Sequence, residues 1–266
     1  HGRTMGSLTL TGQPKYHVGM GPLVGGVLHV DYDDLDALRR VVGPKTAAVI
    51  LEPIQAEGGI RMPSETYLRG VRELCDEAGA LLLFDEVQTG YGRTGKFLGL
   101  EWSGVVPDGC SLAKGIAGGF PLSAMAVTEK LANALPPGSH ASTFGGNPLA
   151  CAAGLAVLDI FDEEGLLENA TRVGAHLRAR LEGLVADAAV PAIEARGQGL
   201  LQGVRLAPEV DPLAFHASLV EAGLLTTLAG GDVVRISPAL NITTSEVDEG
   251  VDRLASMLKR APRKQA

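Results

Sequence analysis

The sequence predicts an α/β protein in which a mostly parallel sheet, with helices on both faces, is followed by a smaller α+β unit. Two apolar runs, residues 47–53 and 80–84, flank a segment of helical periodicity, which is the pattern of a parallel βαβ unit. Both runs are continuous rather than alternating, as in strands covered on both faces. Beyond residue 162, long amphipathic helices surround short strands. We therefore expect residues 1–157 to form a large domain and residues 158–266 a small one.

Composition limits the kinds of partner that the chain can have. The 266 residues are 45% hydrophobic, enough for a folded core, and carry a formal net charge of -8. Binding to nucleic acid requires clustered Lys and Arg, so we expect small-molecule partners and no nucleic acid. The three cysteines are widely spaced and leave one over in any disulfide scheme, and no apolar run is long enough to span a membrane. These features favour a cytoplasmic protein without a membrane partner.

Loops and helices are expected around the two central strands. Residues 1–30 are rich in Gly, Thr and Pro and predict loops with short strands. Residues 31–42 have apolar side chains at helical spacing and predict a short amphipathic helix. A longer helix is expected over residues 64–79, where Gly79 suits the C-terminal cap.

Two further strands and a helix complete the predicted large domain. Residues 107–114 and 123–128 predict strands that are joined by the glycine-rich sequence GIAGGFPL. Asn147 and Pro148 are expected to begin a helix of small residues that runs towards Phe161.

The C-terminal part has a different pattern of apolar residues, typical of amphipathic helices and short strands. Apolar residues at helical spacing predict a surface helix over residues 166–184 and a final helix over residues 247–258. The sequences EARGQGLLQGVRL and GDVVRISPAL predict strands. Arg235 lies inside the second of them, between Val234 and Ile236, where a lone charge is unusual without a partner.

Charged residues follow the predicted strands, where ligands of open α/β sheets bind. Asp85 ends one apolar run, Glu57 follows the other, and Lys114 precedes glycines that allow close backbone approach to a ligand. An amine and a carboxylate at one sheet edge suit a pyridoxal 5'-phosphate (PLP) enzyme, because the amine can hold the aldehyde while the carboxylate keeps the pyridine nitrogen protonated. Taken singly, each residue is equally compatible with a helix cap or a surface charge.

One motif points to a different chemistry. The sequence GYGRTGK at residues 90–96 matches the phosphate-loop spacing GxxxxGK of NTPases. However, Phe97 stands where such loops have the hydroxyl that binds magnesium. The glycine loop also follows the acidic strand instead of preceding it. We therefore reject an NTPase site at this segment.

A series of motifs, taken in order, resembles the class III, ornithine-type aminotransferases of PLP fold type I. The motifs are HGRT with GQPKY, EPIQAEGGI, LLLFDEVQTGYGRTGK, LAKGIAGGFPL, STFGGNPLACAAG, RGQGLLQGV and VVRISPALNIT. They cover nearly the whole chain. Any one motif is weak evidence for the family, whereas the ordered set of motifs is specific for it.

The resemblance implies a role for each of several residues. Lys114 would hold PLP as a Schiff base and move the substrate proton, and Asp85 would pair with the pyridinium nitrogen. Gln88 would donate to the phenolic oxygen of the ring, and Val87 would pack on one ring face. Thr143 would reach the cofactor phosphate of the neighbouring subunit, which implies a homodimer with shared active sites.

The resemblance also implies the substrates. Arg3 and Arg235 would bind carboxylates through bidentate forks, and Glu57 would neutralise Arg235 until 2-oxoglutarate displaces it. The implied reaction is ping-pong transamination from N2-acetylornithine to 2-oxoglutarate, giving N-acetylglutamate 5-semialdehyde and glutamate, in arginine biosynthesis. Ornithine, succinylornithine and 4-aminobutyrate are alternative donors. An aminomutase, or a catalytically incomplete fragment that only binds a partner, is an alternative function.

The chain departs from the family pattern at its beginning. The first residue is His1, and we expect the family's N-terminal portion to be absent, including the Gly-Thr phosphate cup and an aromatic residue that stacks on the cofactor. The sheet of the large domain would then be N-terminally incomplete. Small residues, rather than the glycines frequent in relatives, stand at Ala56, Ala117, Ser123 and Ala141.

Overall fold

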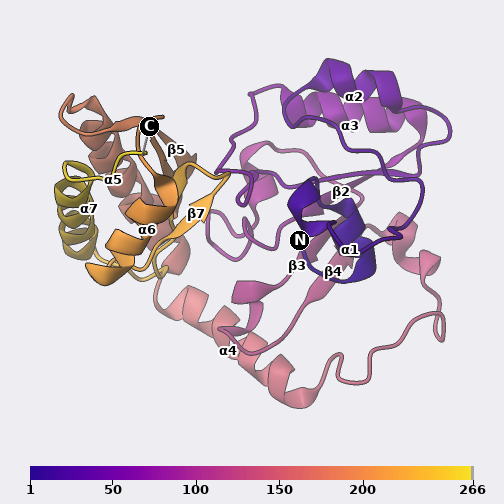
Figure 1. The fold of residues 1–266 in the computed structure, drawn as a ribbon. Helices are drawn as coiled ribbons and strands as arrows, with labels where there is room; N and C mark the ends of the chain where they lie inside the picture. Colours follow the sequence, from indigo (N-terminus) through magenta and orange to yellow (C-terminus); the bar gives the residue numbers. More distant parts are fainter. Residues whose placement is uncertain (265–266) are drawn as a thin grey trace.

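The computed structural model describes residues 1–264, which form two sheets with helices packed around them (Figure 1). The first sheet has the strand order β1-β2-β3-β4. Its strands are β1 (Ala48–Leu51), β2 (Leu81–Asp85), β3 (Gly109–Leu112) and β4 (Ala124–Val127). Strands β1, β2 and β3 are parallel, and β4 is antiparallel to β3. The predicted βαβ unit and mostly parallel sheet are confirmed.

The helix between β1 and β2 forms as predicted. Helix α3 (Tyr67–Ala78) ends at Gly79, whose φ of 70° is the left-handed conformation that glycine adopts at helix C-caps. Together with α2 (Leu35–Val41), it packs against the fully buried Leu82 and Phe84 of β2. This cluster is the core of the first sheet.

Strand β1 is less covered than its continuous apolar run predicts. Val49 and Leu51 pack against the cluster under α2 and α3, whereas Ile50 points to the other face and is 39% exposed. Strand β1 is at the edge of the sheet, and within residues 1–264 the face of β1 that points away from α2 and α3 is only partly covered. The expectation of burial on both faces is wrong for this strand.

The N-terminal segment also differs from the prediction. Residues 1–30 contain helix α1 (Met5–Leu10) and a short 3-10 helix at Pro14–Tyr16, not strands. The Thr9 hydroxyl donates to the carbonyl oxygen of Met5 at 2.7 Å, one turn earlier, which satisfies the hydroxyl inside the helix. The Gly, Thr and Pro content had favoured loops with short strands, but this contact and the burial of Leu8 favour the helix.

The second sheet is antiparallel, with the strand order β5-β6-β8-β7. Its strands are β5 (Ala192–Gln198), β6 (Leu201–Leu206), β7 (Thr227–Ala229) and β8 (Val233–Ile236). The helices around it are α5 (Leu166–Ala186), α6 (Pro212–Glu221) and α7 (Thr244–Leu258). Helices α5 and α7 and strands β5, β6 and β8 agree with the prediction. Helix α6 and strand β7 have no predicted counterpart, because α6 buries only Phe215 and Leu219 and β7 has only three residues.

A helix and a cluster of apolar side chains are among the connections between the two sheets. Helix α4 (Pro148–Glu163) runs from the first sheet towards the second, and the Asn147 side chain caps it by accepting from the backbone nitrogen of Ala150 at 2.9 Å (Figure 1). A small cluster of buried apolar residues, which includes Ile60 and Val233, also connects the loop after β1 with the second sheet. The expected domain boundary between residues 157 and 158 falls within α4 and stays a prediction. Within residues 1–264, no helix is long and apolar enough to cross a membrane.

Candidate active site

The carboxyl ends of β1, β2 and β3 carry the candidate catalytic residues. Asp85 is the last residue of β2, Lys114 follows β3, and Glu57 lies on the loop after β1. Because the three strands are parallel, their carboxyl ends meet at the same edge of the sheet. The topology therefore brings the acid, the amine and the second carboxylate to one side of the fold.

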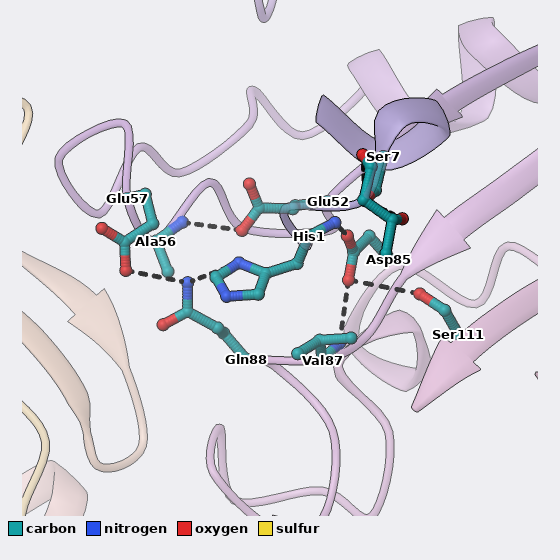
Figure 2. A network of polar contacts seen from close by, with 10 residues as sticks. His1, Ser7, Glu52, Ala56, Glu57, Asp85, Val87, Gln88 and Ser111 are labelled. Carbon is teal, nitrogen blue, oxygen red and sulfur yellow. Dashed lines mark hydrogen bonds and ion pairs between the residues drawn. The ribbon is translucent and has the colours of Figure 1, made fainter. Parts of the chain in front are cut away.

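Asp85 is a buried carboxylate whose two oxygens have different partners. The side chain is 5% exposed, and its Oδ1 accepts from the Val87 backbone nitrogen at 3.1 Å and the Ser111 hydroxyl at 3.3 Å. Its Oδ2 accepts from the amino nitrogen of His1 (Figure 2). Asp85 is thus oriented through the hydrogen bonds to its Oδ1.

Glu57, Gln88 and Arg235 form a polar cluster, called here the switch cluster, between the two sheets. The Arg235 Nη1 donates to the Glu57 Oε1 at 2.6 Å and to the Gln88 Oε1 at 3.1 Å. The Gln88 Nε2 also donates to the Glu57 Oε1, at 3.2 Å (Figure 2). The Nε of Arg235 donates to the Thr227 hydroxyl at 2.9 Å. The lone arginine of β8 therefore has a carboxylate partner that comes from the first sheet.

Two groups at this edge have shifted pKa values. Burial acts to raise the pKa of Glu57, but the hydrogen bond and charge of Arg235, with help from Gln88, hold it below its usual value. Burial lowers the pKa of Lys114 to about 8, with Glu57 acting to raise it and Arg235 to lower it. Glu57 is therefore ionised at neutral pH, and Lys114 has a substantial neutral fraction near pH 8.

Lys114 has a backbone conformation that disfavours most side chains. Its φ is 53°, in the left-handed region that costs a residue with a Cβ about 1–2 kcal/mol. A 3-10 turn, Lys114–Ala117, follows and ends at Gly118 with φ 60°. Backbone strain of this kind persists where the surroundings impose it, and it concentrates at functional sites. The strain therefore supports a functional reason for this lysine.

The remaining predicted site residues are Arg3, Thr143 and Val87. The Arg3 guanidinium packs over the Tyr16 ring, with its central carbon 3.7 Å from the ring centroid. Within residues 1–264, Arg3 makes no hydrogen bond to the switch cluster. Thr143 is exposed in the loop before α4. Val87 is half-buried beside Asp85 and contributes its backbone nitrogen.

Two residues without a predicted role support the site. Glu86 is 1% exposed and accepts from the Gly99 and Leu100 backbone nitrogens at 2.9 and 2.7 Å, which fixes the loop that carries Gln88. Burial raises the pKa of Glu86. Its signal in the sequence is the Asp-Glu pair that ends an apolar run. Ser111 has no local signal, because its contact with Asp85 depends on the register of β2 and β3.

Comparison with known proteins identifies the family. Residues 1–258 match the model of the class-III aminotransferases. The chain belongs to the class-III aminotransferase family. Class-III aminotransferases are PLP-dependent enzymes, so the expected family and cofactor are confirmed at this level.

Relatives of this class-III aminotransferase chain include acetylornithine and ornithine enzymes. It is 48% identical to acetylornithine aminotransferase 1 of Bordetella bronchiseptica over 263 residues, 98% of the chain and 66% of the relative. It is 49% identical to acetylornithine aminotransferase of Myxococcus xanthus over 251 residues, 93% of the chain and 62% of the relative. Among solved structures, ornithine aminotransferase from Toxoplasma gondii matches with a TM-score of 0.92 and 36% identity, covering 98% of this chain and 62% of that one. This likeness confirms the PLP fold type I. The chain spans 62–66% of the length of these relatives.

Proposed function

We propose that the chain belongs to an enzyme that transfers the side-chain amine of N2-acetylornithine to 2-oxoglutarate, in arginine biosynthesis. The observation that carries this proposal is the convergence of Asp85, Lys114 and the switch cluster at one sheet edge. The names of the two curated relatives support acetylornithine as the donor. The Toxoplasma gondii enzyme makes ornithine the second candidate.

The residues at this edge fit PLP. The Asp85 carboxylate is anchored through its Oδ1, and its Oδ2 is of the kind that accepts from a protonated pyridine nitrogen. Lys114 supplies an amine with a pKa of about 8, and the Gly118 and Gly119 backbone beyond it leaves room for a ligand. When bound, PLP supplies an aldehyde that takes up the substrate amine and a ring that accepts electrons from the substrate carbon.

Each side chain at this edge would then have its own role in the reaction. Lys114 holds the aldehyde and, once the substrate amine has replaced it, moves a proton from the substrate carbon. Asp85 keeps the ring nitrogen protonated and oriented. Gln88 donates to the phenolic oxygen of the ring, and Val87 packs on one ring face.

The switch cluster accommodates two substrates of different charge. With Glu57 on Arg235, the pair presents no net charge to the amine donor. When Glu57 turns away, the Arg235 guanidinium is free to bind a carboxylate of 2-oxoglutarate through a bidentate fork. The Thr227 hydroxyl still holds the Arg235 Nε, so the guanidinium keeps its place while Glu57 moves. Arg3 is proposed to bind the other carboxylate after leaving the Tyr16 ring.

We further propose a homodimer with shared active sites, located in the cytoplasm. Exposed apolar side chains lie on β4, on the segment that joins β4 to α4, and on the first turns of α4. They include Met125, Leu135, Phe144, Leu149 and Leu155. A concentration of this kind marks an interaction surface. Thr143 lies within it, so its hydroxyl is well placed to reach the cofactor phosphate of the neighbouring subunit. The three free cysteines are compatible with a reducing compartment.

The proposal is tested by supplying the enzyme that contains this chain with 2-oxoglutarate and each candidate donor. N2-acetylornithine is expected to give the highest kcat/KM, above ornithine, succinylornithine and 4-aminobutyrate, with one glutamate formed for each donor consumed. An isomerised amino acid without glutamate would indicate an aminomutase. Binding of PLP without turnover of any donor would indicate a non-catalytic protein.

The pKa of Lys114 predicts how cofactor attachment depends on pH. Only the neutral amine attacks an aldehyde, so the rate of PLP attachment should rise with pH and level off above a midpoint of about 8. Stopped-flow recording of the visible absorption band at each pH locates this midpoint. In Glu57→Gln, which removes a charge that raises the pKa, the midpoint should move lower. A midpoint near the usual lysine value of 10.5 would contradict the prediction.

The same shift affects the stability of the cofactor-free protein. The pKa of Lys114 is lower in the folded state than in the unfolded state, so the unfolded state binds more protons between pH 8 and 10.5. The contribution of Lys114 to the free energy of unfolding therefore rises with pH across this window.

A further inference from the structure

The GYGRTGK segment has no part in the proposed chemistry, yet it joins the two sheets. The Arg93 Nη1 donates to the carbonyl oxygens of Pro238 at 2.5 Å and of Leu200 at 3.2 Å. The Arg93 carbonyl oxygen accepts from the Leu200 backbone nitrogen at 3.0 Å. Leu200 lies in the turn between β5 and β6, and Pro238 follows β8. Arg93, which lies in the loop after β2 of the first sheet, therefore binds two segments that belong to the second sheet.

Arg93 is a cation bound by carbonyl oxygens rather than by carboxylates. None of the ion pairs within residues 1–264 includes it, and burial lowers its pKa. Removing a guanidinium from water is unfavourable, and an apolar side chain of similar volume would fill this space without that loss. The advantage of arginine here is its planar guanidinium, whose Nη1 directs its hydrogens at two fixed carbonyl oxygens.

Close backbone packing surrounds this contact. A Cβ on Gly199 would lie 2.3 Å from the carbonyl carbon of Thr94, and a Cβ on Gly95 would lie 2.8 Å from the Thr171 Oγ1. The Thr171 hydroxyl donates to the carbonyl oxygen of Gly95 at 2.8 Å. Thr94 is fully buried. The loop thus packs so closely against the second sheet and α5 that neither Gly95 nor Gly199 has room for a side chain.

The loop after β2 meets the end of β8 at two points. Gln88, near the start of the loop, binds the Arg235 side chain, and Arg93, further along, binds the Pro238 carbonyl oxygen. On the other side, the Gly230 backbone nitrogen, in the turn before β8, donates to the Glu57 carbonyl oxygen at 2.9 Å. The contact of Arg93 therefore adds a hold at the far end of β8, beyond Arg235.

We propose that Arg93 is a positioning residue that places Arg235 opposite Glu57 and thereby sets the affinity for the dicarboxylate substrate. This inference rests on the proposed function, because it concerns the binding of 2-oxoglutarate at Arg235. Arg93 acts through the backbone that leaves β8. Asp85 ends β2 and Lys114 follows β3, so both are expected to keep their places when Arg93 is changed.

The test compares the PLP-loaded Arg93→Lys and Arg93→Met enzymes with Lys96→Met. Lys96 is a matched control, since it is exposed in the same segment and its ammonium lies 5.4 Å from the Trp102 ring centroid. Both Arg93 variants should raise the KM for 2-oxoglutarate and the Kd for glutarate, an unreactive dicarboxylate, by about 10-fold or more, because a small misplacement of a binding group has a large effect. The visible absorption band and the rate of the amine-donor half-reaction should stay within about 2-fold of wild type.

A double variant separates positioning from a purely structural role. When Arg235→Gln is already present, Arg93→Lys should change the glutarate Kd little further, because the group that it positions is gone. A purely structural role would lower the melting temperature and slow both half-reactions together, and its effect would add to that of Arg235→Gln. Either this additive result or an unchanged glutarate Kd in the Arg93 variants overturns the inference. Absence of the PLP band in the wild-type enzyme would instead contradict the proposed function.

Discussion

Replacing Lys114 with alanine is expected to lower kcat for transamination by at least about 10⁴-fold, because one change removes both the amine that holds the aldehyde and the base that moves the proton. The visible absorption band of the bound cofactor should disappear. The fold should be retained, because alanine accepts the left-handed backbone conformation at this position no worse than lysine does. Glutamate formation and the absorption spectrum measure the two effects.

Lys96→Ala is the control for this prediction. Lys96 is an exposed lysine of the loop after β2, and its removal should leave kcat within about 2-fold of wild type, as is usual for surface substitutions. A Lys114→Ala enzyme that retains more than one tenth of the wild-type kcat would contradict the role proposed for Lys114.

Replacing Arg235 with glutamine should raise the KM for 2-oxoglutarate by about 10²-fold or more. Loss of one partner of a hydrogen-bonded charge pair typically weakens binding by about 2–5 kcal/mol. In addition, Glu57 would be left as an unpaired carboxylate that repels the substrate carboxylate. Steady-state kinetics with varied 2-oxoglutarate measure the change, and the amine-donor half-reaction should be much less affected.

Arg205→Gln provides a matched control on the neighbouring strand. Arg205 lies on β6 and pairs with Asp232 at 2.9 Å, outside the switch cluster, and this exposed pair is expected to contribute little. The control should leave the KM for 2-oxoglutarate within about 2-fold of wild type. Equal effects of Arg205→Gln and Arg235→Gln would remove the reason for assigning carboxylate binding to Arg235.

The elements predicted correctly have strong local signals. Helices α3, α5 and α7 bury a regular apolar stripe, and β2 is an apolar run between a glycine cap and a carboxylate. The exposed second face of β1 could not be predicted from its composition, because burial depends on what covers a strand. Helix α1 depends on a hydroxyl contact within one turn, and β7 is too short to show a period.

The candidate site was only partly accessible to local reasoning. The approach of Asp85 and Lys114 follows from parallel strands, which the βαβ pattern predicts. The pairing of Glu57 with Arg235 joins the two sheets, so no local pattern reveals it, and here it was implied by the family resemblance. The contacts of Arg93 could not be predicted for the same reason, because they also join the two sheets. The segment that contains Arg93 resembled a phosphate loop instead.

The most direct test of the central claim, that Lys114 is the residue that holds PLP, is borohydride reduction of the PLP-loaded enzyme followed by peptide mapping with mass spectrometry. Reduction makes the link between the amine and the aldehyde permanent. The phosphopyridoxyl group is expected on Lys114. Its presence on Lys15, Lys96 or Lys130, or its absence from every lysine of this chain, would contradict the assignment.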